Sequence, residues 1–137
     1  MSEVAERVWE RMRELVLDRY DRRKQVANEL GMSFAKVKAL RWLAGRPRTM
    51  RELAEALAID RPYATLIVDD LEARGLAARS VHPDDRRRKI VTVTEQGKAK
   101  AERAGRILKE PPAAVLGLAD EDLAKLDEIL ARLSEKS

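Results

Sequence analysis

The length, composition and charge of the chain exclude several classes of protein. A length of 137 residues, with 45% hydrophobic and 38% charged residues, is typical of one folded domain with a highly charged surface. The absence of cysteine excludes disulfide bonds and thiolate nucleophiles. No apolar run reaches the roughly 18 residues of a membrane span, and the N-terminus lacks a signal-peptide pattern, so we expect a cytoplasmic protein without membrane contact.

The net charge of +4 is distributed unevenly along the chain. Residues 31–100 carry 15 basic and nine acidic side chains, whereas the two ends together carry 13 basic and 15 acidic ones. A basic centre favours a polyanionic partner in that region and indicates a different role for the termini.

The first part of the chain has the apolar spacing of helices. Apolar residues three to four positions apart predict one long amphipathic helix over about residues 3–29, ended by Gly31. Ser33 is expected to cap a second helix, which stops near the glycine and proline of residues 44–47.

The next two helices are short and close together. Thr49 and Glu52 form a capping box that opens a third helix, and this helix closes near residues 58–59. Asp60 caps a fourth helix, which ends at residues 74–75 and is expected to bury a stripe of apolar residues: Ala64, Leu66, Ile67 and Leu71. Two short helices joined by so tight a turn must cross steeply, which is the helix-turn-helix geometry.

A β-hairpin is expected after the helix pair. Residues 76–81 and 90–94 have the composition of strands, and residues 82–85 (HPDD) are a turn sequence. The tip and return strand carry four consecutive cations, Arg86 to Lys89, which indicate either a polyanion nearby or a solvated loop. A helix from Thr94 to Glu110 and a last amphipathic helix after Asp120 complete the chain.

Residues 53–97 resemble the MarR family of transcriptional regulators. The resemblance is carried by Glu52-Leu53-Ala54, by residues 69–76 (DDLEARGL), and above all by Asp85-Arg86-Arg87 followed by residues 91–97 (VTVTEQG). It implies a triangular dimer with interlocked terminal helices and two winged domains. It also implies that Arg87, two residues after Asp85, enters the minor groove of DNA. One departure is that Leu66 and Asp70 stand where many members have a basic residue.

The expected fold is therefore mainly α with a small β-hairpin wing, a winged helix-turn-helix with terminal dimerisation helices. We expect one MarR-like domain over residues 1–137, with dimerisation helices at 1–30 and 98–137 and a DNA-binding region at 33–96. The terminal helices also predict a homodimer from area alone, since the small central domain cannot cover both of their apolar faces.

The expected function is binding of double-stranded DNA at a pseudo-palindromic operator, with repression as the outcome typical of the family. The alternative is a winged-helix module that contacts an acidic protein. Polar residues near the start of the fourth helix are expected to reach bases, and the wing to contact DNA; the predicted residues are Arg61, Tyr63, Ala64, Thr65, Val68 or Asp69, Asp85, Arg86, Arg87 and Arg88. Tyr63 could instead pack against the third helix, and Asp85 could simply stabilise the turn.

The resemblance further implies that a small aromatic effector releases the DNA. The residues predicted to lie near such a ligand are Val8, Met12, Phe34, Val37 and Trp42, although aromatic residues on helices are more often core or interface. We expect no catalytic residue, metal site or cofactor, because there is no Ser-His-Asp set or glycine-rich phosphate loop and the single histidine, His82, lies in a turn.

Overall fold

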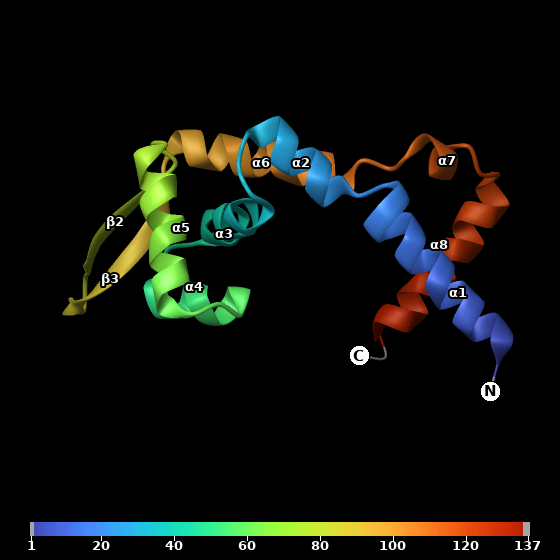
Figure 1. Ribbon diagram of the computed structural model, residues 1–137, viewed down its shortest axis with the longest axis horizontal. Coiled ribbons are helices and arrows are strands. Elements are labelled where there is room, and N and C mark those ends of the chain that lie inside the picture. The colour runs from blue at the N-terminus through green and yellow to red at the C-terminus, as the bar shows by residue number, and fades with distance from the viewer. Residues whose placement is uncertain (1, 136–137) are drawn as a thin grey trace.

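The computed structural model describes residues 2–135, which form a winged domain with helical extensions at both ends (Figure 1). The predicted domain boundaries reach residues 1, 136 and 137, which lie outside the described residues. In chain order the elements are α1 (Glu3–Arg13), η1 (Glu14–Arg19), α2 (Arg22–Leu30), α3 (Phe34–Gly45), β1 (Arg48–Thr49), α4 (Met50–Leu57), α5 (Arg61–Ala73), β2 (Ala77–His82), β3 (Asp85–Val93), α6 (Glu95–Lys109), α7 (Ala113–Leu116) and α8 (Asp120–Glu135).

The four helices of the winged domain begin where the sequence predicts. In each case a capping side chain accepts a hydrogen bond from the backbone N–H three residues later, which satisfies a donor that the helix itself leaves open; the caps are Ser33, Thr49, Asp60 and Thr94. The capping box of Thr49 and Glu52 is complete, because the Glu52 carboxylate also accepts from the Thr49 N–H. The start of each of these helices is therefore determined locally.

The prediction of one helix over residues 3–29 is wrong. The segment contains α1, then the π-helical turn η1, and after a break a separate helix α2. Tyr20 leaves the helical conformation with φ −124° and ψ 49°, and the Asp21 side chain accepts hydrogen bonds from the backbone N–H groups of Arg23 and Lys24. Because Asp21 supplies these donors with an acceptor, a new helix starts there at little cost.

The sheet has three strands in the order β1-β3-β2, all antiparallel. Strand β1, a two-residue strand in which Arg48 pairs with Val91, was not predicted from the sequence. The turn of the hairpin is shorter than the predicted residues 82–85, since His82 already pairs with Asp85. The cations at 86–89 lie within β3, but the register shifts between the pairs Val81–Lys89 and His82–Asp85, so only Lys89 among them has a cross-strand partner.

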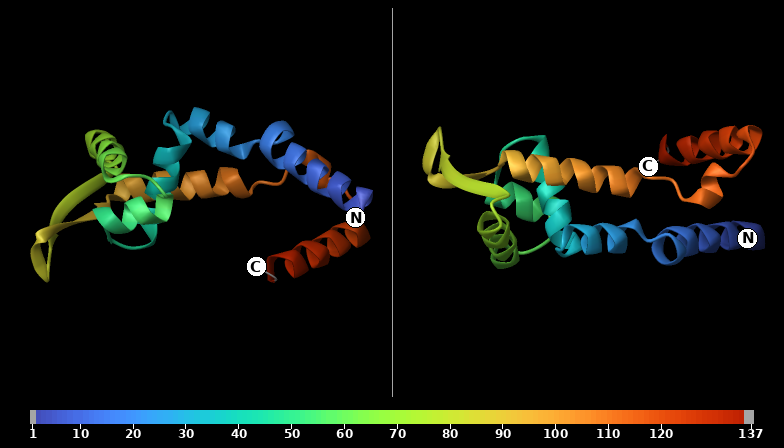
Figure 2. Two further views of the ribbon diagram at one scale, coloured as in Figure 1. Left: turned by 60° about the horizontal axis from the view of Figure 1, so that its bottom comes forward. Right: turned by 90° about the horizontal axis from the view of Figure 1, so that it is seen from above.

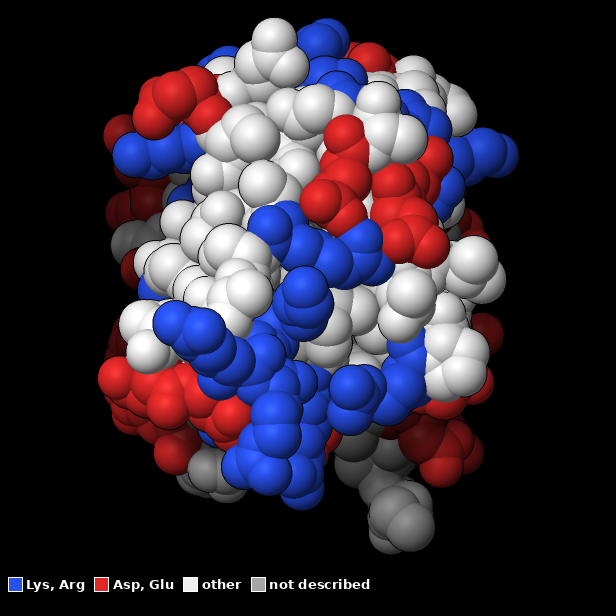
Figure 3. Space-filling view, turned by 90° about the vertical axis from the view of Figure 1, so that its left-hand side faces the viewer, with Lys and Arg blue, Asp and Glu red and all other residues white. Residues whose placement is uncertain are grey.

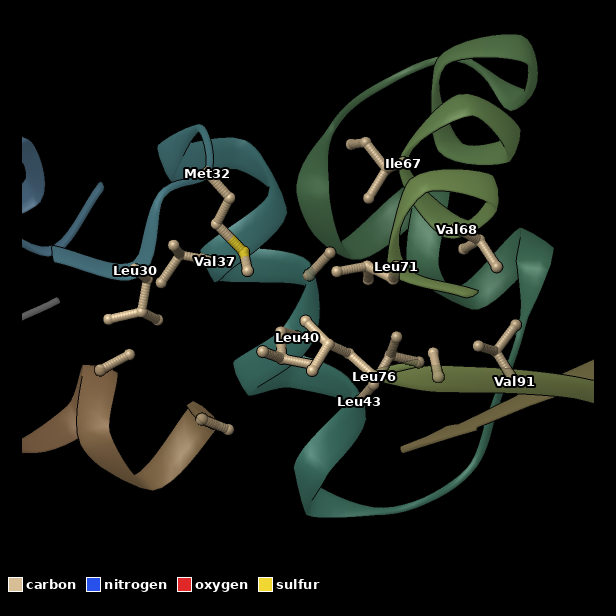
Figure 4. Packing of buried hydrophobic residues seen from close by; sticks show 14 of the residues in the cluster. Leu30, Met32, Val37, Leu40, Leu43, Ile67, Val68, Leu71, Leu76 and Val91 are labelled. Atoms are coloured by element: carbon tan, nitrogen blue, oxygen red, sulfur yellow. The ribbon is translucent and has the colours of Figure 1, made fainter. Parts of the chain in front are cut away.

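The core of the winged domain lies between α3, α5 and the sheet (Figure 4). Its largest fully buried side chains include Leu40 and Leu43 of α3, Ile67 and Leu71 of α5, and Val91 of β3. The predicted stripe of α5 needs one correction: Leu66 is 65% exposed and Val68 is completely buried. The buried positions 64, 67, 68 and 71 follow the spacing of one helix face, and Leu66 falls outside that face.

Helix α6 joins the winged domain to the C-terminal extension. It packs on α2 and α3, and its buried face contains small residues. At its first turn a Cβ on Gly97 would lie 2.0 Å from the backbone oxygen of Leu76, so only glycine fits where the helix crosses the start of the wing.

The terminal helices α1 and α8 extend away from the winged domain. They cross in the view of Figure 1 but lie apart in Figure 2, and neither contains a buried residue. Within residues 2–135 no helix combines the length and the apolar character needed to cross a membrane.

Candidate nucleic-acid interface

Helices α4 and α5 form the expected helix pair. Three residues separate them, and the chain turns at Ala58, whose φ of 55° is left-handed. Asp60 then caps α5, with its carboxylate oxygen 2.7 Å from the Tyr63 nitrogen. Helix α5 and the hairpin of β2 and β3 lie at the same end of the molecule, opposite the terminal helices (Figures 1 and 2).

The first half of α5 exposes most of the residues predicted to contact bases. Arg61, Tyr63 and Thr65 are exposed. Ala64 is completely buried and packs against the core, which contradicts its prediction as a base contact, and the same holds for Val68 as the alternative to Asp69. Fewer side chains of α5 are therefore exposed for base contacts than the sequence predicted.

Asp69 is exposed, but its carboxylate has a partner on the wing. Arg79 of β2 places its Nη2 atom 2.6 Å from the Asp69 Oδ1 atom and pairs through Nη1 with Glu72. The backbone N–H of Arg79 also donates to Glu72. Arg79, which the sequence analysis did not single out, therefore ties the wing to α5 and sets the spacing between them.

Asp70 has a structural role on the side of α5 that faces α3. Its carboxylate lies 3.1 Å from the Lys36 ammonium and 2.7 Å from the Arg74 guanidinium. The hydrogen bond from Lys36 contributes most to holding the pKa of Asp70 below its usual value, and the bond from Arg74 adds to it. Arg74 also donates to the carbonyl of Gly31 at 3.0 Å, which connects the end of α5 to the loop before α3.

On the wing, Arg87 is held by hydrogen bonds to Asp85. The Asp85 Oδ1 atom accepts hydrogen bonds from the Arg87 backbone N–H at 3.0 Å and from the Arg87 Nε at 3.3 Å. These bonds hold the pKa of Asp85 below its usual value, so the carboxylate stays charged. The Arg87 side chain is nevertheless 92% exposed, so the rest of its guanidinium can meet a ligand.

Cations gather on the end of the molecule that carries α5 and the wing. Figure 3 shows lysine and arginine side chains across the middle and lower part of this face, with a group of acidic side chains above them. The exposed cations of β3 are Arg86, Arg87, Arg88 and Lys89, and Arg61 is exposed at the start of α5. Within the turn, His82 accepts a hydrogen bond from the Asp84 N–H through Nδ1 at 3.0 Å, as expected of a turn residue.

The structure does not bring the five predicted ligand residues together. Val37 is completely buried in the core, while Val8 lies on α1 with an exposed side chain. The Trp42 ring lies under the Arg48 guanidinium, 4.2 Å from it. Met12 lies on α1, and Phe34 packs on the edge of the core.

A cleft between α3 and α6 is lined by none of these five residues. It has a volume of about 450 Å³ and is bordered by Arg41, Ala44, Ala101, Glu102, Gly105, Arg106 and Lys109. Within residues 2–135 there is no group of three or more His, Cys, Asp or Glu side chains that could hold a metal ion.

A tight helix pair and an antiparallel wing, both packed against α3, define a winged helix-turn-helix protein. Residues 30–88 match the model described as the MarR family.

Solved structures agree with this fold along most of the chain. YusO from Bacillus subtilis is 21% identical, with a TM-score of 0.79 and full coverage of both chains. The apo form of wild-type MarR from E. coli is 23% identical, with a TM-score of 0.72 over 90% of this chain and 94% of that one. A point mutant of MepR from S. aureus, described as bound to an oligodeoxyribonucleotide, is 20% identical, with a TM-score of 0.72 and 96% coverage of each chain.

Proposed function

We propose that this protein is a transcriptional regulator that binds double-stranded DNA as a homodimer and represses genes at a pseudo-palindromic operator. One observation carries the proposal: the exposed start of α5 and the cations of the wing lie at the same end of the molecule. The MepR relative described as bound to an oligodeoxyribonucleotide supports DNA as the partner.

In the proposed complex the two elements read different grooves. The polar side chains at the start of α5 enter the major groove, where each base pair presents a distinct set of donors and acceptors. Arg87 enters the narrow, electronegative minor groove beside it. Asp85 orients Arg87 before DNA arrives, and Arg79 fixes the distance between helix and wing, so little order has to be gained on binding.

The homodimer is proposed from the terminal helices. Their apolar side chains are exposed in the single chain; among them are Val4, Val8, Trp9, Leu126, Ile129, Leu130 and Leu133. A second copy would cover them by twofold symmetry, and the two recognition helices would then meet half-sites one turn of DNA apart. The predicted aromatic effector stays a prediction: among residues 2–135, neither the cleft between α3 and α6 nor a second cleft around the end of α4 is lined by any of its five residues.

The proposal is tested by a gel shift with the DNA upstream of the protein's own coding region. We expect binding that weakens about 1,000-fold or more between about 50 and about 200 mM salt, because several phosphate contacts release counterions. Arg87→Ala should cost roughly 1 to 3 kcal/mol of binding free energy.

Arg103→Ala is the matched control, since it removes the same charge from α6, away from the wing, and should leave affinity for the operator nearly unchanged. Absence of duplex binding at low salt would contradict the proposal and favour the protein-contact module. An equal loss in both variants would show that Arg87 acts only through net charge.

A further inference from the structure

The recognition helix carries a large apolar side chain on its solvent side. Leu66 is 65% exposed, whereas its neighbours Ile67 and Val68 are buried. It lies in the half of α5 that begins with Arg61 and includes the exposed side chains of Tyr63 and Thr65. Removal of an exposed leucine side chain from water is favourable, so a binding partner that covers Leu66 would gain free energy from the contact.

Few polar groups on this part of α5 are free to read bases. Arg61 is the only basic residue between positions 61 and 73. The carboxylates of the same helix are already engaged, Asp69 and Glu72 by Arg79, and Asp70 by Lys36 and Arg74. The exposed surface of this half of α5 therefore combines Arg61, Tyr63 and Thr65 with one large aliphatic side chain, that of Leu66, which is more exposed than Tyr63.

We propose that Leu66 recognises thymine by contact with its methyl group in the major groove. The inference rests on the proposed function, and it names the chemistry that gives part of the specificity. DNA fits this surface better than an apolar protein partner does, because the neighbouring wing carries the four cations at 86–89 (Figure 3). Thymine alone among the four unmodified bases presents a methyl group in the major groove, and apolar side chains make contact with it.

Deoxyuridine provides a test that changes only this contact. It pairs like thymidine and offers the same hydrogen-bonding groups, but it lacks the methyl. A duplex is first selected from a random library with the full-length chain, and each thymine is then replaced in turn by deoxyuridine. At one thymine in each half-site we expect the wild-type affinity to fall about fourfold, the effect of withdrawing one methyl from an apolar contact.

The second arm of the test uses Leu66→Ala. This variant removes an exposed side chain and keeps a good helix former, so it should fold. It should bind the selected duplex more weakly and show no further loss at the sensitive thymine. Val81→Ala is the matched control, since it shortens a 48% exposed apolar side chain on β2, and it should keep the fourfold sensitivity.

The possible failures are distinguishable. If no duplex is selected, the proposed function and the inference fall together. If a duplex is selected but no thymine is sensitive, or if Leu66→Ala retains the full sensitivity, DNA binding stands and the reading of thymine by Leu66 is overturned.

Discussion

Asp85 lies among the cations of the wing, where simple electrostatics would predict that it opposes DNA binding. Its oxygen instead accepts two hydrogen bonds from Arg87, one from the backbone and one from the guanidinium. A side chain as long as arginine loses considerable rotamer freedom when it binds, and restricting it beforehand reduces that loss. Asp85 therefore has two opposite effects on DNA affinity: it positions Arg87, which favours binding, and it carries a negative charge, which opposes binding. A substitution of Asp85 shows which effect is larger.

We expect Asp85→Ala to weaken operator binding about fivefold even though it raises the net positive charge, because a charge-assisted hydrogen bond that positions Arg87 is lost. Fluorescence anisotropy with a labelled operator measures the change. Asp84→Ala is the control: it removes the same charge from the adjacent turn position, whose side chain has no ion pair among residues 2–135, and should bind equally or more tightly. Tighter binding by both variants would contradict a positioning role.

The candidate site could be predicted from sequence only where local chemistry determines it. Asp85 and Arg87 are two residues apart, so their contact is encoded within the turn. The partners of Arg79 lie seven and ten residues earlier on α5, and no local pattern indicates that contact. Leu66 was misassigned because, next to Ile67, an apolar residue looks buried, although positions 64, 67, 68 and 71 already complete the helix face.

At the scale of elements, most boundaries that depend on local contacts are predicted from the sequence, and boundaries that depend on distant contacts are missed. The four caps in the winged domain act within three residues, and all of them are confirmed. The break at Tyr20 escaped prediction because the apolar period continues across it, while the start of α2 depends on the Asp21 side chain. Strand β1 escaped because two residues carry no period, and its partner Val91 is distant in sequence.

The contact between α3 and α5 gives a prediction that depends on pH. Asp70 has a lowered pKa in the folded protein, so its carboxylate stabilises the fold above the pKa of the unfolded chain, and the contribution is lost as pH falls through the folded pKa. We expect Asp70→Asn to lower the free energy of unfolding at pH 7 by about 1 kcal/mol, a modest value because both ion pairs are partly exposed. Thermal unfolding should show a drop in Tm of roughly 3 to 5 °C for a chain of this length.

The pH dependence distinguishes the ion pairs from a packing effect. Once the pH falls below the lowered pKa of Asp70 in the folded state, its carboxyl is protonated and the ion pairs are lost, so wild type and Asp70→Asn should converge in Tm. Asp84→Asn should match wild type both at pH 7 and at low pH, because its side chain makes no ion pair within the described residues. A loss of equal size at pH 7 and at low pH would indicate that asparagine disturbs the packing of α5 on α3.

On the scale of the whole molecule, the buried core and the exposed apolar surface occupy opposite ends. The core is confined to α2, α3, α4, α5, α6 and the sheet, whereas α1 and α8 have no buried residue and expose large apolar side chains. The winged domain should therefore fold without help from the ends. The ends, in turn, have reason to associate with a second copy, because exposed apolar surface on this scale is unfavourable in water.

We expect Ile129→Glu to prevent the proposed homodimer from forming and to leave a folded monomer. Ile129 is 46% exposed on α8 in the single chain, and a carboxylate there would be forced into an apolar interface without a partner. Analytical ultracentrifugation should give half the wild-type mass, while circular dichroism stays helical. Leu66→Glu is the control: it makes the same chemical change at a more exposed position on α5 and should remain dimeric.

The same variant connects assembly to DNA binding. A dimer holds its second recognition helix close to the second half-site, and this effective concentration raises overall affinity by about 100- to 10,000-fold over a single domain. Ile129→Glu should therefore bind the full operator weakly, with the affinity that it shows for one half-site, although every residue of its own α5 and wing is intact. A wild-type chain that sediments as a monomer yet binds the full operator tightly would show that the exposed faces of α1 and α8 serve another partner.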